Sequence, residues 1–186
     1  LTISLGGGFP KFEKVTKFQK SFLLPLLKNE LIGTEQIILD FGCGPGRFTS
    51  DLATLVNGKC IGVDPVEVFI KNAEKITQNT DFKVISNGKL PIENESIDVL
   101  WICLVLGGIT SRKKLKNAVH ELDRVLRKGG LIFLVENVSQ KQSSNHWVFR
   151  ETEMYKKLFS DICILDEKDS YFDLQEKIAV MSGRKI

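Results

Sequence analysis

Apolar residues along the chain fall into two kinds of spacing. In residues 37–41 and 60–63 they form short uninterrupted runs, which are typical of strands buried on both faces of a sheet. In residues 11–29 and 115–126 they recur every three or four positions, which predicts helices with one apolar face. The chain is therefore expected to alternate between strands and helices.

The two helices carry further signals. The apolar stripe of the first consists of Phe12, Val15, Phe18, Phe22 and Leu26. Pro25 is expected to weaken the last turns of this helix because proline lacks the amide donor that a helix interior needs. The second helix is followed by Arg127, Lys128 and Gly129, which predict a basic last turn and a glycine stop.

The remaining elements complete the pattern. We expect further helices over residues 47–56, 66–76 and 148–159, and further strands over residues 82–85, 97–106, 131–135, 162–165 and 178–181. Strands that alternate with helices require right-handed crossovers and a parallel sheet. No helix separates the last two strands, so one of them is expected to be antiparallel. The predicted fold is α/β, a doubly wound, mostly parallel seven-stranded sheet with helices on both faces and an antiparallel C-terminal strand.

Composition narrows the class of protein. The 186 residues are 42% hydrophobic and 26% charged, which predicts an ordinary globular domain over residues 1–186. A net charge of +3 is too small to mark a nucleic-acid or membrane-surface binder. The longest apolar stretch, residues 99–109, is shorter than the roughly 20 residues that cross a bilayer, so no membrane span is expected. The chain begins with Leu1 rather than Met, and we expect native N-terminal residues to be missing.

Cysteine and histidine usage bears on location and on metal binding. The four cysteines have no CxxC spacing, and three of them lie in apolar runs, which favours a reduced, cytoplasmic setting. The two histidines are isolated from each other and from the cysteines, so no metal site is expected. The sequence gives no indication of the oligomeric state.

A glycine-rich loop follows the first predicted strand, in residues 40–46 (DFGCGPG). Ligands of doubly wound sheets bind at the carboxyl ends of the strands, and glycines let a ligand lie against the main chain. A dinucleotide-binding loop would need glycine where Arg47 stands, and a Walker loop would need Gly-Lys-Ser/Thr, which is absent here. Both NAD and a nucleoside triphosphate are therefore disfavoured, and a merely tight turn is the remaining alternative.

An acidic residue followed by GxGxG resembles the first motif of the class I S-adenosylmethionine-dependent methyltransferases. The resemblance continues at Asp64, at the end of the second strand. It also includes Leu90-Pro91 with the IDV of residues 97–99, and the segment from Glu121 to Gly130, which is similar to the family's "E..RVLkpGG". These ordered matches are similar to the small-molecule branch of the family.

The resemblance implies that S-adenosylmethionine is the cofactor and S-adenosylhomocysteine its product. It implies that Gly42, Gly44 and Gly46 lie against the methionine and ribose portion of the cofactor. It also implies that Asp40 helps hold the amino group, and that Cys103, in the fourth strand, contacts the cofactor.

For Asp64 the resemblance implies that the carboxylate accepts hydrogen bonds from both ribose hydroxyls. The alternative from the residues themselves is that Asp64 caps the next helix, with Pro65 at its first position. Both roles are compatible, and Pro65 is included with the cofactor-binding residues.

Two segments depart from the family pattern. Where relatives often have an aspartate that accepts from the adenine amino group, this chain has Ser86 followed by Asn87, and either can accept a hydrogen bond. Where relatives often carry His or Glu after the fourth strand, this chain has residues 106–108 (LGG), which offer no base.

The catalytic base is therefore sought elsewhere, and the candidates are Glu136, directly after the fifth strand, and His146. Each has an alternative role: Glu136 as an acceptor for backbone amides, and His146 as a packed or surface residue. The polar loop of residues 137–147 and the N-terminal helix within residues 1–30 are expected to hold the acceptor.

We expect methyl transfer to a small polar acceptor, such as a hydroxyl of a sugar or another metabolite. Basic clusters at residues 11–20 and 112–116 leave RNA methylation as an alternative, although most such clusters are solvated faces. A second alternative is a non-catalytic partner subunit that binds S-adenosylmethionine, because residues 86 and 106–108 depart from the family pattern.

Overall fold

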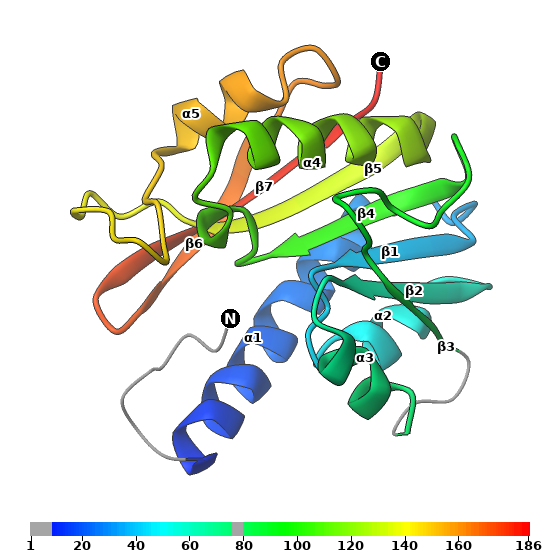
Figure 1. Cartoon of the computed structure of the whole chain (residues 1–186), viewed down its shortest axis with the longest axis horizontal. Helices are drawn as coiled ribbons and strands as arrows, with labels where there is room; N and C mark the ends of the chain where they lie inside the picture. Colours follow the sequence, from blue (N-terminus) through cyan, green and yellow to red (C-terminus); the bar gives the residue numbers. More distant parts are fainter. Residues whose placement is uncertain (1–8, 76–79) are drawn as a thin grey trace.

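The computed structural model describes residues 9–75 and 80–186 (Figure 1). Seven strands form one sheet in the order β3-β2-β1-β4-β5-β7-β6. The strands are β1 Ile37–Phe41, β2 Lys59–Asp64, β3 Thr80–Val84, β4 Ile97–Cys103, β5 Leu126–Asn137, β6 Asp166–Asp173 and β7 Glu176–Arg184. Strands β3, β2, β1, β4 and β5 are parallel, whereas β7 is antiparallel to both of its neighbours. The predicted fold class is therefore confirmed.

Helices cover both faces of this sheet (Figure 1). They are α1 Phe9–Glu30, α2 Thr49–Ala53, α3 Glu67–Ala73, α4 Arg112–Val125 and α5 Thr152–Leu158, with a single 3-10 turn, η1, over Leu106–Gly108. Side chains of α1 and α2 pack in one apolar cluster with the sheet, and side chains of α4 and α5 pack in another. Among residues 9–75 and 80–186, no helix has the length and apolar character that a bilayer crossing requires.

Alternate residues of the central strands supply the two apolar clusters. Ile38 and Trp101 face α1 and α2, whereas Leu39 and Leu100 face the α4 side, and all four are fully buried. The Trp101 ring stacks on Phe133, with 5.3 Å between ring centroids. Burial on both faces explains why these strands are uninterrupted apolar runs in the sequence.

Helix α1 packs through a row of residues that matches the predicted stripe only in part. Leu23 and Leu27 are fully buried, whereas Phe18 is 48% exposed. Phe22 and Leu26 of the predicted stripe are partly buried and pack against the same apolar cluster. Phe18 and Phe22 also contact the ring of Tyr171 in β6, at centroid distances of 5.4 Å each. The predicted Phe12 side chain lies outside the described side chains.

Two predicted element boundaries in the C-terminal half are wrong. The apolar run at residues 162–165 is not a strand; it lies before β6, where Ile162, Cys163 and Leu165 are buried in the core. Strand β6 is more polar because it forms the edge of the sheet and most of its residues are exposed or half-buried. Similarly, α4 ends at Val125 and residues 126–130 belong to β5, where the Arg127 side chain forms an ion pair with Asp98.

Candidate functional site

The predicted cofactor residues gather at the carboxyl ends of β3, β2, β1 and β4, which end side by side in the sheet (Figure 1). Residues 42–46 follow β1, Asp64 ends β2, residues 86–87 lie just beyond β3, and Cys103 ends β4. The chain runs outward from β1 through β2 to β3 and then returns to place β4 on the other side of β1. Ligands of doubly wound sheets bind at this switch in strand order.

The glycine loop is fastened to β2 by its own backbone. The amides of Gly42 and Cys43 both donate to the Val63 carbonyl, at 2.8 and 3.1 Å. Gly42, Gly44 and Gly46 all have positive φ, at 73°, 54° and 82°, a region that side chains other than glycine rarely adopt. The backbone conformation of the loop is therefore by itself a reason for glycine at these three positions.

The three glycines differ in what surrounds them. A Cβ on Gly42 would lie 2.6 Å from the Val105 side chain, and one on Gly46 would lie 3.2 Å from Phe82. A Cβ on Gly44 would meet no atom within 4 Å. Gly42 and Gly46 are thus required by contacts within the protein, whereas the space beside the Gly44 Cα is unoccupied.

Asp64 joins the loop to the next helix. One carboxylate oxygen accepts from the Gly44 amide at 3.0 Å, and the other accepts from the Val66 amide at 2.8 Å. The second contact lies within the turn before α3, whose N-cap is Val66 without a side-chain cap hydrogen bond, so the predicted cap with Pro65 at the first helical position is not formed. Contact with a ribose stays a prediction, and each carboxylate oxygen can accept a further hydrogen bond. Pro65 beside it is exposed.

Asp40 is a buried acid behind the glycine loop. The Thr49 hydroxyl donates to its carboxylate at 2.7 Å. Burial raises the pKa of Asp40 to about 7, although the Thr49 hydrogen bond and the charge of Arg47 act in the opposite direction. A cationic amino group nearby would favour the ionised form of Asp40, which is consistent with the predicted contact to the cofactor.

Ser86 and Asn87 form part of a tight turn beyond β3. Asn87 and Gly88 have positive φ of 53° and 70°, and the Lys89 amide donates to the Ser86 carbonyl at 2.9 Å. This is the geometry that Asn-Gly pairs favour in two-residue hairpin turns. Both predicted side chains are exposed, and their contact with adenine stays a prediction.

A buried polar group between α1 and β6 was missed from the sequence. Arg47, next to the glycine loop, donates to the Gln19 side chain at 2.5 Å, and Gln19 donates to the Tyr171 hydroxyl at 2.9 Å. Gln19 and Tyr171 are buried. A single glutamine among the aromatic residues of the first helix was the available signal. This chain of contacts ties the N-terminal helix to the cofactor loop.

Cys103 lies at the end of β4 and is half-buried. Burial is the largest influence on its thiol and raises the pKa of Cys103 to about 12. The raised pKa disfavours the thiolate form of Cys103, and its contact with a cofactor stays a prediction.

Glu136 has a different environment from the one a base requires. Its side chain is fully buried and accepts from the amides of Val105 and Leu106, at 2.8 and 2.6 Å. The Tyr155 hydroxyl also donates to it, at 3.3 Å. Burial raises the pKa of Glu136 to about 7 against these hydrogen bonds. Because it has no exposed surface and its oxygens are occupied, we do not assign Glu136 as the base.

The other candidate base, His146, is exposed in the segment between β5 and α5. Its own amide donates to the Ser144 hydroxyl at 3.2 Å. The structure does not bring it to a described site residue, and its catalytic role stays a prediction.

The glycines after β4 accommodate an aromatic side chain. A Cβ on Gly107 would lie 2.2 Å from the indole ring of Trp147, and one on Gly108 would lie 3.7 Å from it. In the sequence alone, residues 107 and 108 are positions that lack a catalytic side chain. The structure shows that the space beside Gly107 is filled by Trp147, a contact across forty positions that no local motif signals.

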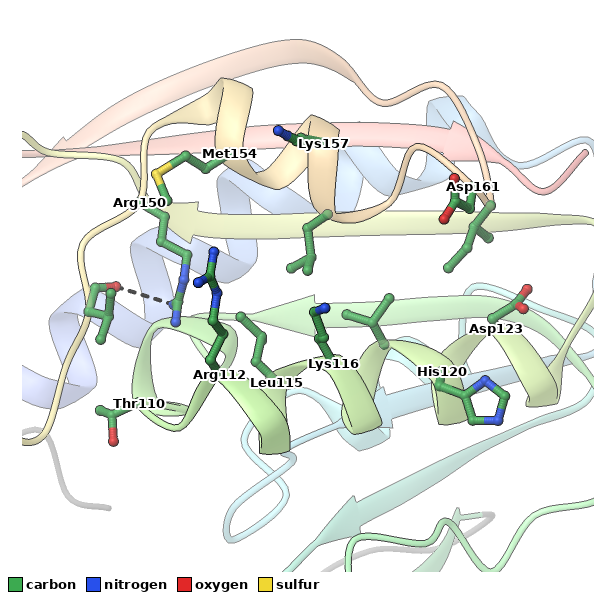
Figure 2. Close-up of a pocket in the computed structure, with 14 residues that line it drawn as sticks. Thr110, Arg112, Leu115, Lys116, His120, Asp123, Arg150, Met154, Lys157 and Asp161 are labelled. Carbon is green, nitrogen blue, oxygen red and sulfur yellow. Dashed lines mark hydrogen bonds between the residues drawn. The ribbon is translucent and has the colours of Figure 1, made fainter.

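A groove of about 970 Å³ lies elsewhere, between α4 and α5 (Figure 2). Leu115, Val119 and Leu158 line it together with charged residues such as Arg112 and Lys157. None of the predicted cofactor residues lines this groove. It is therefore distinct from the carboxyl ends of the strands, where the glycine loop lies.

A glycine loop at the switch in strand order, with an acidic residue ending the next strand and an antiparallel strand inserted near the sheet edge, defines a Rossmann-like methyltransferase fold. The methyltransferase domain family matches residues 39–134, and the chain belongs to this family.

Relatives by sequence include phosphoethanolamine N-methyltransferase 3 of Arabidopsis thaliana. It is 29% identical over 150 residues, which cover 74% of this chain and 30% of the relative. A phosphoethanolamine N-methyltransferase of Zea mays is 30% identical over 150 residues, covering 74% of this chain and 29% of the relative. The chain thus spans about 30% of the length of these relatives.

Solved structures share the fold. A SAM-dependent methyltransferase from Aquifex aeolicus superposes with a TM-score of 0.70 at 17% identity, covering 95% of this chain and 98% of that one. This level of identity shows a common fold and does not by itself identify a common substrate.

Proposed function

We propose that the protein transfers the methyl group of S-adenosylmethionine to a small polar acceptor, with a hydroxyl of a sugar or another metabolite as the expected class. The observation that carries this proposal is the unoccupied space beside Gly44, whose amide is held by Asp64, at the switch in strand order. Membership of the methyltransferase domain family supports it.

The described residues fit the cofactor. The space beside Gly44 is unoccupied, Asp64 has acceptor capacity beyond its two amide contacts, and the buried Asp40 suits a neighbouring cation. When bound, the cofactor supplies an electrophilic methyl group on a sulfonium. The residues of the chain would hold and orient it, and alignment of the reactants can account for about 7–11 kcal/mol of the barrier.

A second candidate acceptor is the amine of phosphoethanolamine, because two of the relatives bear that substrate in their names. An amine attacks through the lone pair of its neutral form. It therefore needs less assistance from a general base during methyl transfer than a hydroxyl does. His146 remains the candidate base for a hydroxyl acceptor because it is exposed, whereas Glu136 is fully buried.

The test is methyl transfer from labelled S-adenosylmethionine to a panel of hydroxylated metabolites and phosphoethanolamine, with the wild-type protein and Asp64→Ala. We expect transfer to at least one member of the panel, and at least tenfold less with the variant at limiting cofactor. Absence of cofactor binding by the wild-type protein would contradict the proposal.

RNA methylation is the alternative that a specific observation favours, because Arg112, Lys113, Lys114 and Lys116 are all exposed near the start of α4. Of the other basic cluster, Lys14 and Lys17 are exposed, whereas Lys20 forms an ion pair with Asp51 at 2.7 Å. RNA binding through such a surface would weaken steeply as salt is raised. Cofactor binding without transfer to either RNA or the metabolite panel would favour a non-catalytic subunit.

We expect a cytoplasmic setting, and the cysteines support it because all four are unpaired, including the buried Cys43, Cys60 and Cys163.

A further inference from the structure

Two buried charged side chains hold the turn that follows β4. Glu136 accepts from the amides of Val105 and Leu106, and more weakly from Gly107 at 3.4 Å. The Arg150 guanidinium donates to the carbonyls of Leu106 and Ile109, at 2.9 and 3.1 Å. The amides of the turn therefore donate to a carboxylate, and its carbonyls accept from a guanidinium.

The same two side chains join the turn to the segment that precedes α5. Glu136 belongs to β5, whereas Arg150 lies just before α5 and points toward the start of α4 in Figure 2. The Val148 amide also donates to the Gly107 carbonyl at 2.8 Å. These contacts place Trp147 directly against Gly107.

The turn touches the cofactor side through Val105. A Cβ on Gly42, in the glycine loop, would lie 2.6 Å from the Val105 side chain. Two residues further along the turn, Gly107 contacts the indole of Trp147. The turn thus lies between the glycine loop and Trp147, so its position fixes where the indole stands relative to the cofactor loop.

The arrangement is costly in energy, which argues for a specific role. Leu104, at the start of the turn, has a φ of 58°, which a bulky side chain rarely adopts. Burying a carboxylate and a guanidinium also costs free energy that hydrogen bonds must offset. In addition, the Trp147 Nε1 atom is buried and has no hydrogen-bond partner among the described residues.

We propose that Glu136 and Arg150 are positioning residues for methyl transfer, which hold the indole of Trp147 over Gly107 as a wall of the acceptor site. The inference rests on the proposed function and extends it. It assigns the acceptor side to the indole ring of Trp147, whose N–H edge is buried against Gly107.

The first test uses Trp147 fluorescence in two glycine variants. A Cβ in Gly107→Ala would overlap the indole, whereas a Cβ in Gly108→Ala would be at ordinary contact distance. Trp101 is fully buried in the core and provides a constant background. We expect Gly107→Ala to shift the emission and Gly108→Ala to leave it unchanged. Equal emission from both variants and the wild type would overturn the placement of Trp147.

The second test separates positioning from a structural role. It uses an acceptor that the wild-type protein methylates in the metabolite panel, with Glu136→Gln, Arg150→Met and Arg150→Lys. We expect the acceptor KM to rise at least fivefold in the first two variants, with partial recovery in Arg150→Lys. The cofactor Kd is expected to change less than twofold in all three.

The two possible failures are distinguishable. Loss of cofactor binding in the wild-type protein would remove the proposed function itself. An unchanged acceptor KM in Glu136→Gln and Arg150→Met, in a wild-type background that does transfer methyl groups, would overturn only the positioning role.

Discussion

The two sides of the candidate site are built in different ways. On the cofactor side, a seven-residue loop and one acid at the end of the next strand are held mainly by backbone contacts, such as the Gly42 amide on Val63. On the acceptor side, Glu136 and Arg150 reach a turn that lies 30 and 44 positions away from them in the sequence. The first side depends on glycine geometry, and the second depends on buried charges.

This difference predicts different responses to substitution. A change in the glycine loop is expected to disturb backbone conformation and cofactor affinity together. A change in the contacts around Glu136 and Arg150 is expected to leave cofactor affinity intact.

Gly42→Ala is expected to have the largest effect. The substitution combines a positive φ with a clash against Val105, and we expect a loss of about 2–4 kcal/mol in the free energy of unfolding. Gly44→Ala shares the positive φ but has open space, so it should cost about 1–2 kcal/mol. Urea denaturation of both variants measures the difference. Equal losses would show that Val105 does not constrain the loop.

Asp64→Ala is expected to weaken cofactor binding at least tenfold, or about 1.4 kcal/mol. It removes the acceptor for the Gly44 and Val66 amides as well as the predicted ribose contact. Asp81→Ala is the matched control, because Asp81 lies in the neighbouring strand and forms an exposed ion pair with Lys59. Calorimetric titration with S-adenosylmethionine measures both. Unchanged affinity in Asp64→Ala would remove the main site assignment.

Two of the buried acids, Asp40 and Glu136, make a distinct contribution to the pH dependence of stability. Burial raises the pKa of both Asp40 and Glu136 to about 7, well above the values of exposed carboxyl groups. The folded state therefore binds more protons than the unfolded state between about pH 4 and 7. The stability that these groups contribute is present below the unfolded pKa values and is lost as pH rises to about 7.

Chemical denaturation across this pH range measures the effect. Asp40→Asn and Glu136→Gln together are expected to flatten the pH profile relative to the wild type. A double variant whose profile retains the same slope would show that other groups control the pH dependence.

Tyr155→Phe is expected to have the smallest effect. It removes the hydroxyl that donates to Glu136 at 3.3 Å and should cost about 0.5–1.5 kcal/mol of stability. Cofactor affinity should stay within twofold, because the Tyr155 hydroxyl donates to Glu136 rather than to a residue of the glycine loop. A tenfold loss of cofactor affinity would contradict the separation of the two sides.

The same comparison explains what could be predicted from the sequence. The strands, their mostly parallel arrangement and the cofactor loop follow from local patterns: buried apolar runs, and three glycines that the backbone conformation demands. The acidic residue and the three glycines of the loop all lie within residues 40–46, so the motif can be recognised from one short segment. The fold class and the gathering of the predicted cofactor residues at one sheet edge were therefore accessible.

The rest depends on contacts between distant residues. Gly107 reads as an absent side chain until the structure places Trp147 beside it. For Glu136 the sequence leaves open a base or an acceptor of backbone amides, and the structure shows three amide partners. The edge strand β6 was missed because its exposed residues lack an apolar run, whereas the buried Ile162 to Leu165 segment imitates a strand.

The central claim is that S-adenosylmethionine binds at the glycine loop rather than in the groove between α4 and α5. The most direct measurement is a titration of ¹⁵N-labelled protein with S-adenosylmethionine, followed by amide chemical shifts. We expect the largest shifts at Gly44 and Asp64, with Leu115 and Val119 of the groove unaffected. Largest shifts at Leu115 and Val119, or no shifts at saturating cofactor, would contradict the account.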